Sequence, residues 1–383
     1  MLWKEGYTST NGALRLHDSL DDTLFYGPVD AFISAGQSNE SGRGELTNKE
    51  TGIPQVTTFG NDYLWKQLEE PTDSPVNQVD SVSKDGDGPA HSSLVKFGKD
   101  LYTSIQKPIS IIPNSLGGTS IQLWQPPATR FDRTTLFGSM DYRIQKTLEN
   151  NRVIKAFLWF QGEHDSGFAE KTAVYTEYYL AFINALRSYY GVVPFFYTQL
   201  ATTNYYTSSA KITEQQRLLE TGNGNSKALA KHYMIVTHDL SFIDTVHLDK
   251  AGQIELGRRR ALAVRQYLYG HSVNGTGPRL VSITQPTPNT IKVKTTKTIN
   301  DHNTYENYFK AFDNNAPVTI QSLGRDPADD TAVLITLGTS ISGTMTIDYT
   351  PPSGRSLHTR VYNIVKDSAG LPLPLFGPIG LTN

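Results

Sequence analysis

Short apolar runs alternate with helical periodicities between about residues 29 and 270. Runs with few polar interruptions that stop near glycine or proline predict strands covered on both faces. Stretches in which apolar side chains recur every three or four residues predict helices. The predicted strands are 29–35, 108–113, 154–160, 193–200 and 233–236, and the predicted helices are about 92–105, 174–189, 209–231 and 254–268. Five strands separated by helices indicate an α/β three-layer sandwich with a mostly parallel five-stranded sheet.

The pattern changes near residues 274–278, where the chain reads NGTGP. Beyond this point helical periodicity ends, and short alternating segments are separated by Pro, Gly, Asn and Asp. Such segments predict a small antiparallel β-sandwich. We therefore predict three parts, which are an irregular N-terminal lead-in at residues 1–27, the α/β domain at 28–272 and an all-β accessory domain at 276–383.

Composition excludes several classes of protein. The 383 residues carry 35 basic and 37 acidic side chains, a formal charge of −2, which argues against a nucleic-acid binder. There is no cysteine, which excludes disulfides and thiolate chemistry. The nine histidines show no spacing typical of paired metal ligands, so no metal or other cofactor is expected. No apolar run approaches the ~18 residues that span a bilayer, and no signal peptide is recognised. The run Arg258–Arg260 is interpreted as the solvated face of a helix.

Polar residues, most of them with glycine, follow the ends of several predicted strands. These segments are Gly36–Asn39, Asn114–Thr119, Gln161–Asp165 and Asp244–His247. In an open parallel sheet, ligands bind beyond the carboxyl ends of the strands. We therefore expect the four segments to form one site.

The residue types in these segments suit ester hydrolysis. A serine hydroxyl such as that of Ser38 needs a base to take its proton, and the imidazole of His247 can serve near pH 7. The imidazole needs a carboxylate to fix its tautomer, and Asp244 is three residues away on the same loop. A developing oxyanion needs backbone N–H donors at small residues and a side-chain amide, for which Gly118 and Gln161 are candidates. Taken alone, Ser38 would more often simply cap the following helix, and only the other three segments favour a nucleophile.

Four blocks carry a resemblance to a known family. The chain reads GQSNESG at 36–42, GGTSIQLW at 117–124, WFQGEHD at 159–165 and DTVH at 244–247. In this order the blocks resemble those of SGNH (GDSL-like) hydrolases of the sialate O-acetylesterase and carbohydrate esterase family six type. The resemblance implies an SGNH-hydrolase-like α/β fold and does not cover the C-terminal hundred residues.

The resemblance also implies roles for individual residues. Ser38 would be the nucleophile, His247 the base and Asp244 the acid that orients it, although in some relatives the glutamate found here as Glu163 is thought to serve. The oxyanion hole would be formed by Ser38, Gly118 and Gln161. Predicted substrate-binding residues are Gln37, Asn39, Gly117, Thr119 and Trp124, although a tryptophan is about as often simply core. Glu40 stands where relatives have methionine and His164 where they have a small residue, which we expect to alter substrate shape.

Two functions from different classes follow. The first is a carbohydrate O-acetylesterase that deacetylates a polysaccharide, with bacterial cell surfaces as the expected source. The second is a catalytically inert glycan-binding component of a phage tailspike or fibre, and a spike carrying an active esterase would combine the two. Either function predicts that the chain is located in a virion tail or outside the cell. If it is a tailspike, a homo-trimer is expected. A bacterial enzyme whose signal peptide lies outside this sequence is a third candidate. The C-terminal domain could bind sugar, mediate oligomerisation or brace the catalytic domain.

Overall fold

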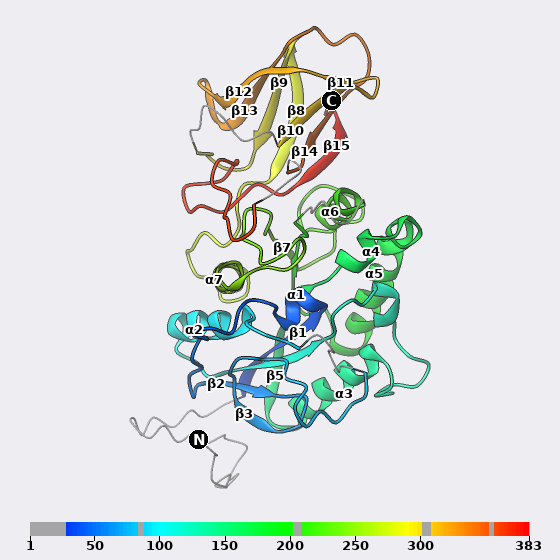
Figure 1. Cartoon of the computed structure of the whole chain (residues 1–383), viewed down its shortest axis with the longest axis vertical. Helices are drawn as coiled ribbons and strands as arrows, with labels where there is room; N and C mark the ends of the chain where they lie inside the picture. The colour runs from blue at the N-terminus through cyan, green and yellow to red at the C-terminus, as the bar shows by residue number, and fades with distance from the viewer. Residues whose placement is uncertain (1–27, 83–87, 202–207, 301–307, 352–355, 383) are drawn as a thin grey trace.

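The computed structural model describes residues 28–82, 88–201, 208–300, 308–351 and 356–382. The predicted lead-in at 1–27 lies outside the described residues. An α/β part and a β-rich C-terminal part follow one another along the long axis of the molecule (Figure 1). This order along the chain agrees with the change of pattern near residue 274.

The α/β part is built on one seven-stranded sheet with the order β3-β2-β4-β1-β5-β6-β7. Its strands are β1 (Val29–Gly36), β2 (Val56–Phe59), β3 (Trp65–Gln67), β4 (Ile109–Ser115), β5 (Arg152–Phe160), β6 (Phe195–Thr198) and β7 (His232–Ile235). Neighbouring strands pair in parallel except β2 and β3, so the predicted mostly parallel sheet is confirmed. The predicted count of five is too low. Strands β2 and β3 have only four and three residues and include polar ones, so they carry no apolar run.

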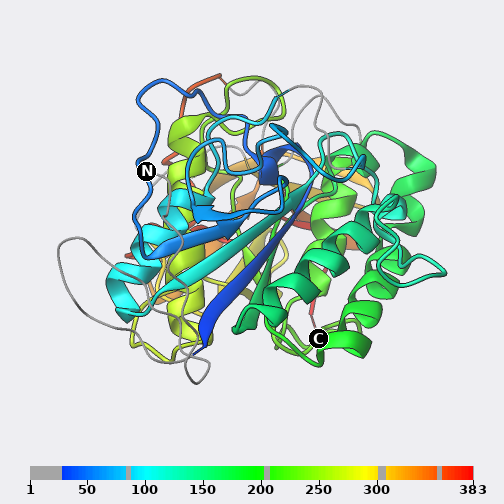
Figure 2. The same cartoon turned by 90° about the horizontal axis from the view of Figure 1, so that it is seen from below.

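Helices cover both faces of this sheet. They are α1 (Ser38–Ser41), α2 (Leu94–Ile105), η1 (Ile121–Trp124), α3 (Leu136–Glu149), α4 (Glu163–Ser166), α5 (Ala169–Tyr190), α6 (Ser209–Leu218) and α7 (Lys250–Tyr267). Seen along the sheet, α2 and α7 lie on one side of the strands and α3 and α5 on the other (Figure 2). No helix within the described ranges has the length and apolar character needed to cross a bilayer.

One predicted helix is much shorter than expected. Periodicity predicts a helix over 209–231, but α6 ends at Leu218. Gly222 and Gly224 follow with φ of +78° and +75°, a left-handed conformation that ends helices and that glycine adopts without strain. The second half of the prediction is wrong because glycine and asparagine in TGNGN outweigh the apolar spacing.

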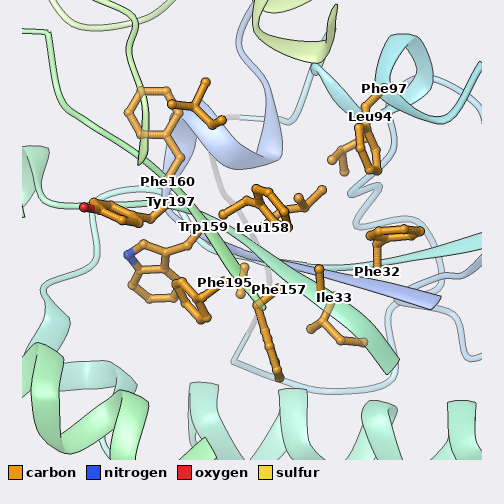
Figure 3. Close-up of a cluster of buried hydrophobic side chains, with 14 of the residues drawn as sticks. Phe32, Ile33, Leu94, Phe97, Phe157, Leu158, Trp159, Phe160, Phe195 and Tyr197 are labelled. Carbon is orange, nitrogen blue, oxygen red and sulfur yellow. The ribbon is translucent and has the colours of Figure 1, made fainter. Parts of the chain in front are cut away.

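Aromatic and aliphatic side chains fill both layers beside the sheet. Figure 3 shows Phe32, Phe97 and Leu94 gathered near the strands, and the rings of Phe32 and Phe97 meet edge to face with centroids 5.3 Å apart. Trp159 of β5 is also buried, and its ring centroid lies 4.7 Å from that of Phe182 on α5. Burial of each such side chain stabilises the fold by about 1.5–3 kcal/mol. The strands therefore read as continuous apolar runs because both of their faces are covered.

The C-terminal part consists of two four-stranded antiparallel sheets with the orders β11-β10-β14-β15 and β12-β13-β9-β8. Their strands are β8 (Leu280–Thr287), β9 (Thr290–Thr295), β10 (Phe309–Asp313), β11 (Ala316–Val318), β12 (Ile320–Asp326), β13 (Asp329–Leu337), β14 (Met345–Tyr349) and β15 (Phe376–Gly380). These sheets enclose an apolar core of their own, separate from that of the α/β part. The predicted β-sandwich is thus confirmed.

Strand β1 lies at the point where the strand order reverses. The chain first builds β2, β3 and β4 on one side of β1 and then crosses to β5 on the other side. Loops that follow β1, β4 and β5 therefore diverge around one crevice at the carboxyl ends of these strands. Three of the four polar segments singled out in the sequence lie on these loops.

Candidate active site

A serine, a histidine and an aspartate from distant parts of the chain are in hydrogen-bond contact. Ser38 Oγ lies 2.9 Å from His247 Nε2, and His247 Nδ1 lies 2.7 Å from Asp244 Oδ2. A carboxylate can only accept, so Nδ1 carries the proton and donates it to Asp244. Nε2 is then free to accept the proton of Ser38. The contact predicted between residues 38 and 247 is therefore present.

The loop that carries Asp244 and His247 is shaped by the aspartate itself. Asp244 Oδ1 accepts the N–H groups of Val246 and His247, both at 2.7 Å, which folds the backbone into a tight Asx turn. Ile243 N–H also donates to His247 O at 2.9 Å. Burial by itself raises the pKa of Asp244, but the hydrogen bonds from His247 and Val246 bring it below its ordinary value. Asp244 therefore stays ionised at neutral pH, as an orienting carboxylate must.

The alternative acid, Glu163, contacts a different residue. Its Oε1 accepts from Asn39 Nδ2 at 2.7 Å, and the same amide donates to Val246 O at 3.1 Å. Asn39 Oδ1 accepts Leu248 N–H at 3.0 Å, so Asn39 ties the helix after β1 to the histidine-bearing loop. Asn39 is buried and fully bonded, which contradicts its prediction as a substrate contact. Burial raises the pKa of Glu163 to about 7. The structure places Asp244, and not Glu163, beside the imidazole.

Two backbone N–H groups on the loops after β1 and β4, those of Ser38 and Gly118, are candidates to receive a developing oxyanion. Strands β1 and β4 pair with Gly36 opposite Ser115, so the loops after them emerge side by side. Neither the Ser38 nor the Gly118 N–H donates to another atom of the described residues. Gly118 is exposed with φ of +69°, a conformation that glycine adopts without strain. Ser38 and Gly118 therefore stay candidates for the oxyanion hole.

The side-chain amide predicted for the oxyanion hole is used elsewhere. Gln161 is buried, and its Nε2 donates to Thr119 O at 2.9 Å and to Asp165 Oδ2, which occupies both amide hydrogens. Gln161 therefore holds the loop that carries Gly118 in place, and neither of its amide hydrogens is left for an oxyanion. This corrects its prediction as an oxyanion donor. Gln37 Oε1 accepts the N–H groups of Gly162 and His164, at 3.3 and 3.2 Å. The Nε2 of Gln37, the residue before Ser38, has no acceptor among the described residues.

Two more predicted substrate contacts are structural. Thr119 is buried, and its hydroxyl donates to Leu116 O at 2.8 Å and accepts from Trp124 Nε1 at 3.2 Å. Trp124 is fully buried against Trp159, with ring centroids 5.2 Å apart, so it is core and not a sugar platform. Gly117 is half-buried next to Gly118. Sequence patterns alone could not separate these packing roles from ligand contacts.

Glu40, which replaces the methionine of relatives, forms a buried ion pair. Both Glu40 and Arg260 of α7 have no exposed side-chain surface, and both guanidinium Nη atoms contact the Glu40 carboxylate. Ser34 Oγ donates to the same carboxylate, and Arg260 Nη1 donates to Ser93 Oγ at 2.6 Å. The Glu40 carboxylate is therefore buried in an ion pair and has no exposed surface for a ligand, contrary to the expected effect on substrate shape. It fixes the helix that begins with Ser38.

Arg259 and Arg260 also correct the interpretation of the arginine run as a solvated face. Arg259 is buried and donates to both carboxylate oxygens of Asp239, at 2.7 and 2.6 Å. Of the three arginines only Arg258 is partly exposed, and it pairs with Glu255 one turn earlier. The signal that could have revealed Arg260 is the unusual acid at position 40, because a buried acid requires a partner.

The Glu40 pair supports a prediction on stability. Glu40→Met leaves the Arg260 guanidinium buried without its carboxylate, so the free energy of unfolding should fall by about 3–5 kcal/mol. Urea unfolding of the variant and the wild type measures the difference. A second substitution, Arg260→Met, should recover most of the loss. A single variant within about 1 kcal/mol of wild type would contradict the assignment of this pair.

His164, the other departure from the family pattern, lies at the surface beside α5. Its Nε2 lies 2.7 Å from Lys171 Nζ, and its ring centroid is 5.2 Å from that of the exposed Phe168. Partial burial and the nearby Lys171 lower the pKa of His164. Within the described ranges, no group of three or more His, Asp and Glu side chains is arranged to hold a metal ion.

A family model and a curated relative match the α/β part. The model described as carbohydrate esterase, sialic acid-specific acetylesterase, matches residues 28–266, more than half of the chain. A probable carbohydrate esterase of Arabidopsis thaliana is 26% identical over 153 residues, which cover 36% of this chain. The matched region spans only about half of that relative, 55% of its length.

Solved structures share the fold. A protein of Arabidopsis thaliana superposes with a TM-score of 0.52 at 22% identity, covering 63% of this chain and 98% of that one. A carbohydrate acetylesterase from Xanthomonas citri superposes with a TM-score of 0.64 at 19% identity, covering 91% of this chain and 80% of that one. At such identities the likeness shows the architecture alone. Coverage of 91% extends beyond the α/β part into the C-terminal sheets.

Proposed function

The chain belongs to the carbohydrate esterases of the sialic acid-specific acetylesterase family, and on this premise we propose that it removes acetyl groups from a carbohydrate through an acyl-enzyme on Ser38. The observation that supports the serine mechanism is the contact of Ser38 Oγ with His247 Nε2, together with the contact of His247 Nδ1 with Asp244. An activated hydroxyl, a base and an orienting acid within hydrogen-bond reach are what nucleophilic acyl transfer requires.

Acylation would begin with attack of Ser38 Oγ on the carbonyl carbon of the acetyl ester while its proton passes to His247 Nε2. The carbonyl oxygen becomes an oxyanion that the N–H groups of Ser38 and Gly118 can stabilise, and the amide of Gln37 is a further candidate donor. The bond between the carbonyl carbon and the sugar oxygen then breaks. His247 returns the proton to that oxygen, which leaves as the sugar hydroxyl.

Deacylation would use the same residues with water in place of the serine. His247 Nε2 takes a proton from water, and the hydroxyl attacks the acetyl carbon bound to Ser38 Oγ. The bond between the acetyl carbon and Ser38 Oγ then breaks, and the proton from His247 restores the serine hydroxyl. The acetic acid that leaves ionises to acetate in solution. Asp244 stays ionised throughout and stabilises the imidazolium formed in each half-reaction.

We further propose an O-acetylated polysaccharide of bacterial cell surfaces as the substrate, met outside the cell or at a virion tail. This step rests on the attached β-sandwich and on the analogy with deacetylating tailspikes. The triad with its free oxyanion donors favours an active esterase over an inert glycan-binding spike, because a binding protein needs no aligned proton relay.

Acetate release tests the proposal. The purified protein is expected to liberate acetate from p-nitrophenyl acetate and from at least one member of a panel of O-acetylated bacterial polysaccharides, followed by mass spectrometry. The panel also identifies the glycan. Failure to release acetate from the small ester and from every polymer would refute the esterase, and glycan binding without turnover would support the inert spike.

A further inference from the structure

Residues 356–361 belong to the C-terminal part and contact the part of the molecule that carries His247. We call residues 356–361 the strap and residues 239–249 the histidine loop. The strap leads directly into Ile364 and Val365, which are buried in the core of the β-sandwich. Figure 1 shows the red C-terminal chain descending from the sandwich toward α7. The strap is thus anchored in one domain while it contacts the other.

The backbone of the strap pairs with the first leg of the histidine loop. His358 N–H donates to Phe242 O at 2.7 Å, and Val361 N–H donates to Asp239 O at 2.9 Å, so the two segments run in opposite directions. Phe242 also forms an antiparallel bridge with Leu248 at the base of the hairpin that presents His247. The strap therefore adds a further backbone segment alongside this hairpin.

Charged side chains strengthen the same contact. Asp239 is buried at the start of the histidine loop, where Arg259 of α7 holds both of its oxygens. Arg360 of the strap places Nη2 3.4 Å from Asp239 Oδ2 and 3.2 Å from Glu255 Oε1. Burial by itself would raise the pKa of Asp239, but the arginines lower it to about 2. The carboxylate therefore stays charged and holds the strap arginine.

The second leg of the histidine loop meets the strap as well. Asp249 caps α7 by accepting Gly252 N–H at 2.8 Å, and its Oδ1 also accepts Ser241 Oγ at 2.6 Å, which joins the two legs. His358 Nδ1 lies 3.4 Å from Asp249 Oδ2 and 3.5 Å from Glu45 Oε1. The strap thus contacts both ends of the histidine loop.

We propose that the β-sandwich positions His247 through the strap, with Arg360 and His358 as positioning residues that act on the histidine loop. The inference rests on the proposed esterase function. A loop held at both ends keeps the imidazole within reach of Ser38, whereas a displacement of about 1 Å can cost about 100-fold in rate. Of the three roles considered for the C-terminal domain, this assigns bracing.

Arg360→Ala tests the proposal in the full-length protein. It should lower kcat for p-nitrophenyl acetate about tenfold with KM within about twofold, because the relay and not ester binding is disturbed. Arg360→Lys should restore part of kcat. Hydrogen exchange of the histidine loop should be faster in Arg360→Ala than in wild type. Arg279→Ala is the matched control, because Arg279 forms an ion pair with Glu220 from the first residues of the C-terminal part and does not contact the histidine loop.

The control separates positioning from general destabilisation. Arg279→Ala is expected to lower Tm while kcat stays within about twofold of wild type. Unchanged kcat in Arg360→Ala, or an equal fall of kcat in both variants, would overturn the proposal. If the wild type itself releases no acetate, the esterase function fails, and the proposal for the strap then stands or falls on the hydrogen exchange of the histidine loop.

Discussion

Alanine at position 38 is expected to lower kcat for acetyl esters by about 10⁵–10⁶-fold while the fold is kept. The substitution removes the only oxygen that can form the acyl-enzyme in the proposed mechanism. Among the described residues, the Oγ of Ser38 forms a hydrogen bond with His247 alone, so the change deletes one hydrogen bond and leaves a small gap at the carboxyl end of β1. Acetate release gives the rate, and circular dichroism with Tm checks the fold.

Ser41→Ala is the matched control for this substitution. Ser41 is buried on the same helix, and its hydroxyl donates to Ser38 O at 3.2 Å without contacting His247. We expect it to retain most of kcat and to react with a fluorophosphonate probe, whereas Ser38→Ala should not be labelled. A Ser38→Ala protein that still released acetate, or that still reacted with the probe, would move the nucleophile to another residue.

The sequence was sufficient to predict a mostly parallel α/β sheet and to select Ser38, Asp244 and His247, which the structure brings into hydrogen-bond contact. Strands such as β1 and β5 are buried on both faces, so their apolar runs stand out, and the polar segments that follow parallel strands must meet at one edge. Ser38, Asp244 and His247 are recognisable because each occupies a motif whose chemistry is local. The short strands β2 and β3 carry no such run and could not be predicted in this way.

The supporting residues could not be assigned from sequence because their partners are distant. Gln161 and Asn39 have the amide groups of ligand-binding residues, but only the fold shows that Thr119 and Val246 use them. Arg260 lies 220 positions from Glu40, so the arginine run gives no local sign that it is buried. The strap and the histidine loop are likewise far apart in the sequence, so their contact could not be predicted from either segment.

Asp244→Asn should reduce kcat by about 10³–10⁴-fold, whereas Glu163→Gln should cost less than about tenfold. An asparagine amide at 244 would donate to Nδ1, which forces the proton onto Nε2 and leaves no acceptor for the hydroxyl of Ser38. Glutamine at 163 keeps the oxygen that accepts from Asn39, so the histidine-bearing loop stays tied.

The pH dependence of stability separates the two acids independently. Burial raises the pKa of Glu163 to about 7, above its ordinary value in the unfolded chain. The favourable contribution of the protonated Glu163 to the free energy of unfolding is therefore complete at low pH. That contribution is lost as the pH rises from about 4.5 to about 7, because over this range Glu163 is ionised in the unfolded chain but still protonated in the folded one. Glu163→Gln should therefore gain stability relative to wild type over this range, as urea unfolding at several pH values would show. Asp244→Asn should show the opposite trend, because the lowered pKa of Asp244 makes its contribution to stability favourable only at higher pH.

A large loss of kcat in Glu163→Gln with little in Asp244→Asn would transfer the orienting role to Glu163 and require the loop to rearrange during catalysis.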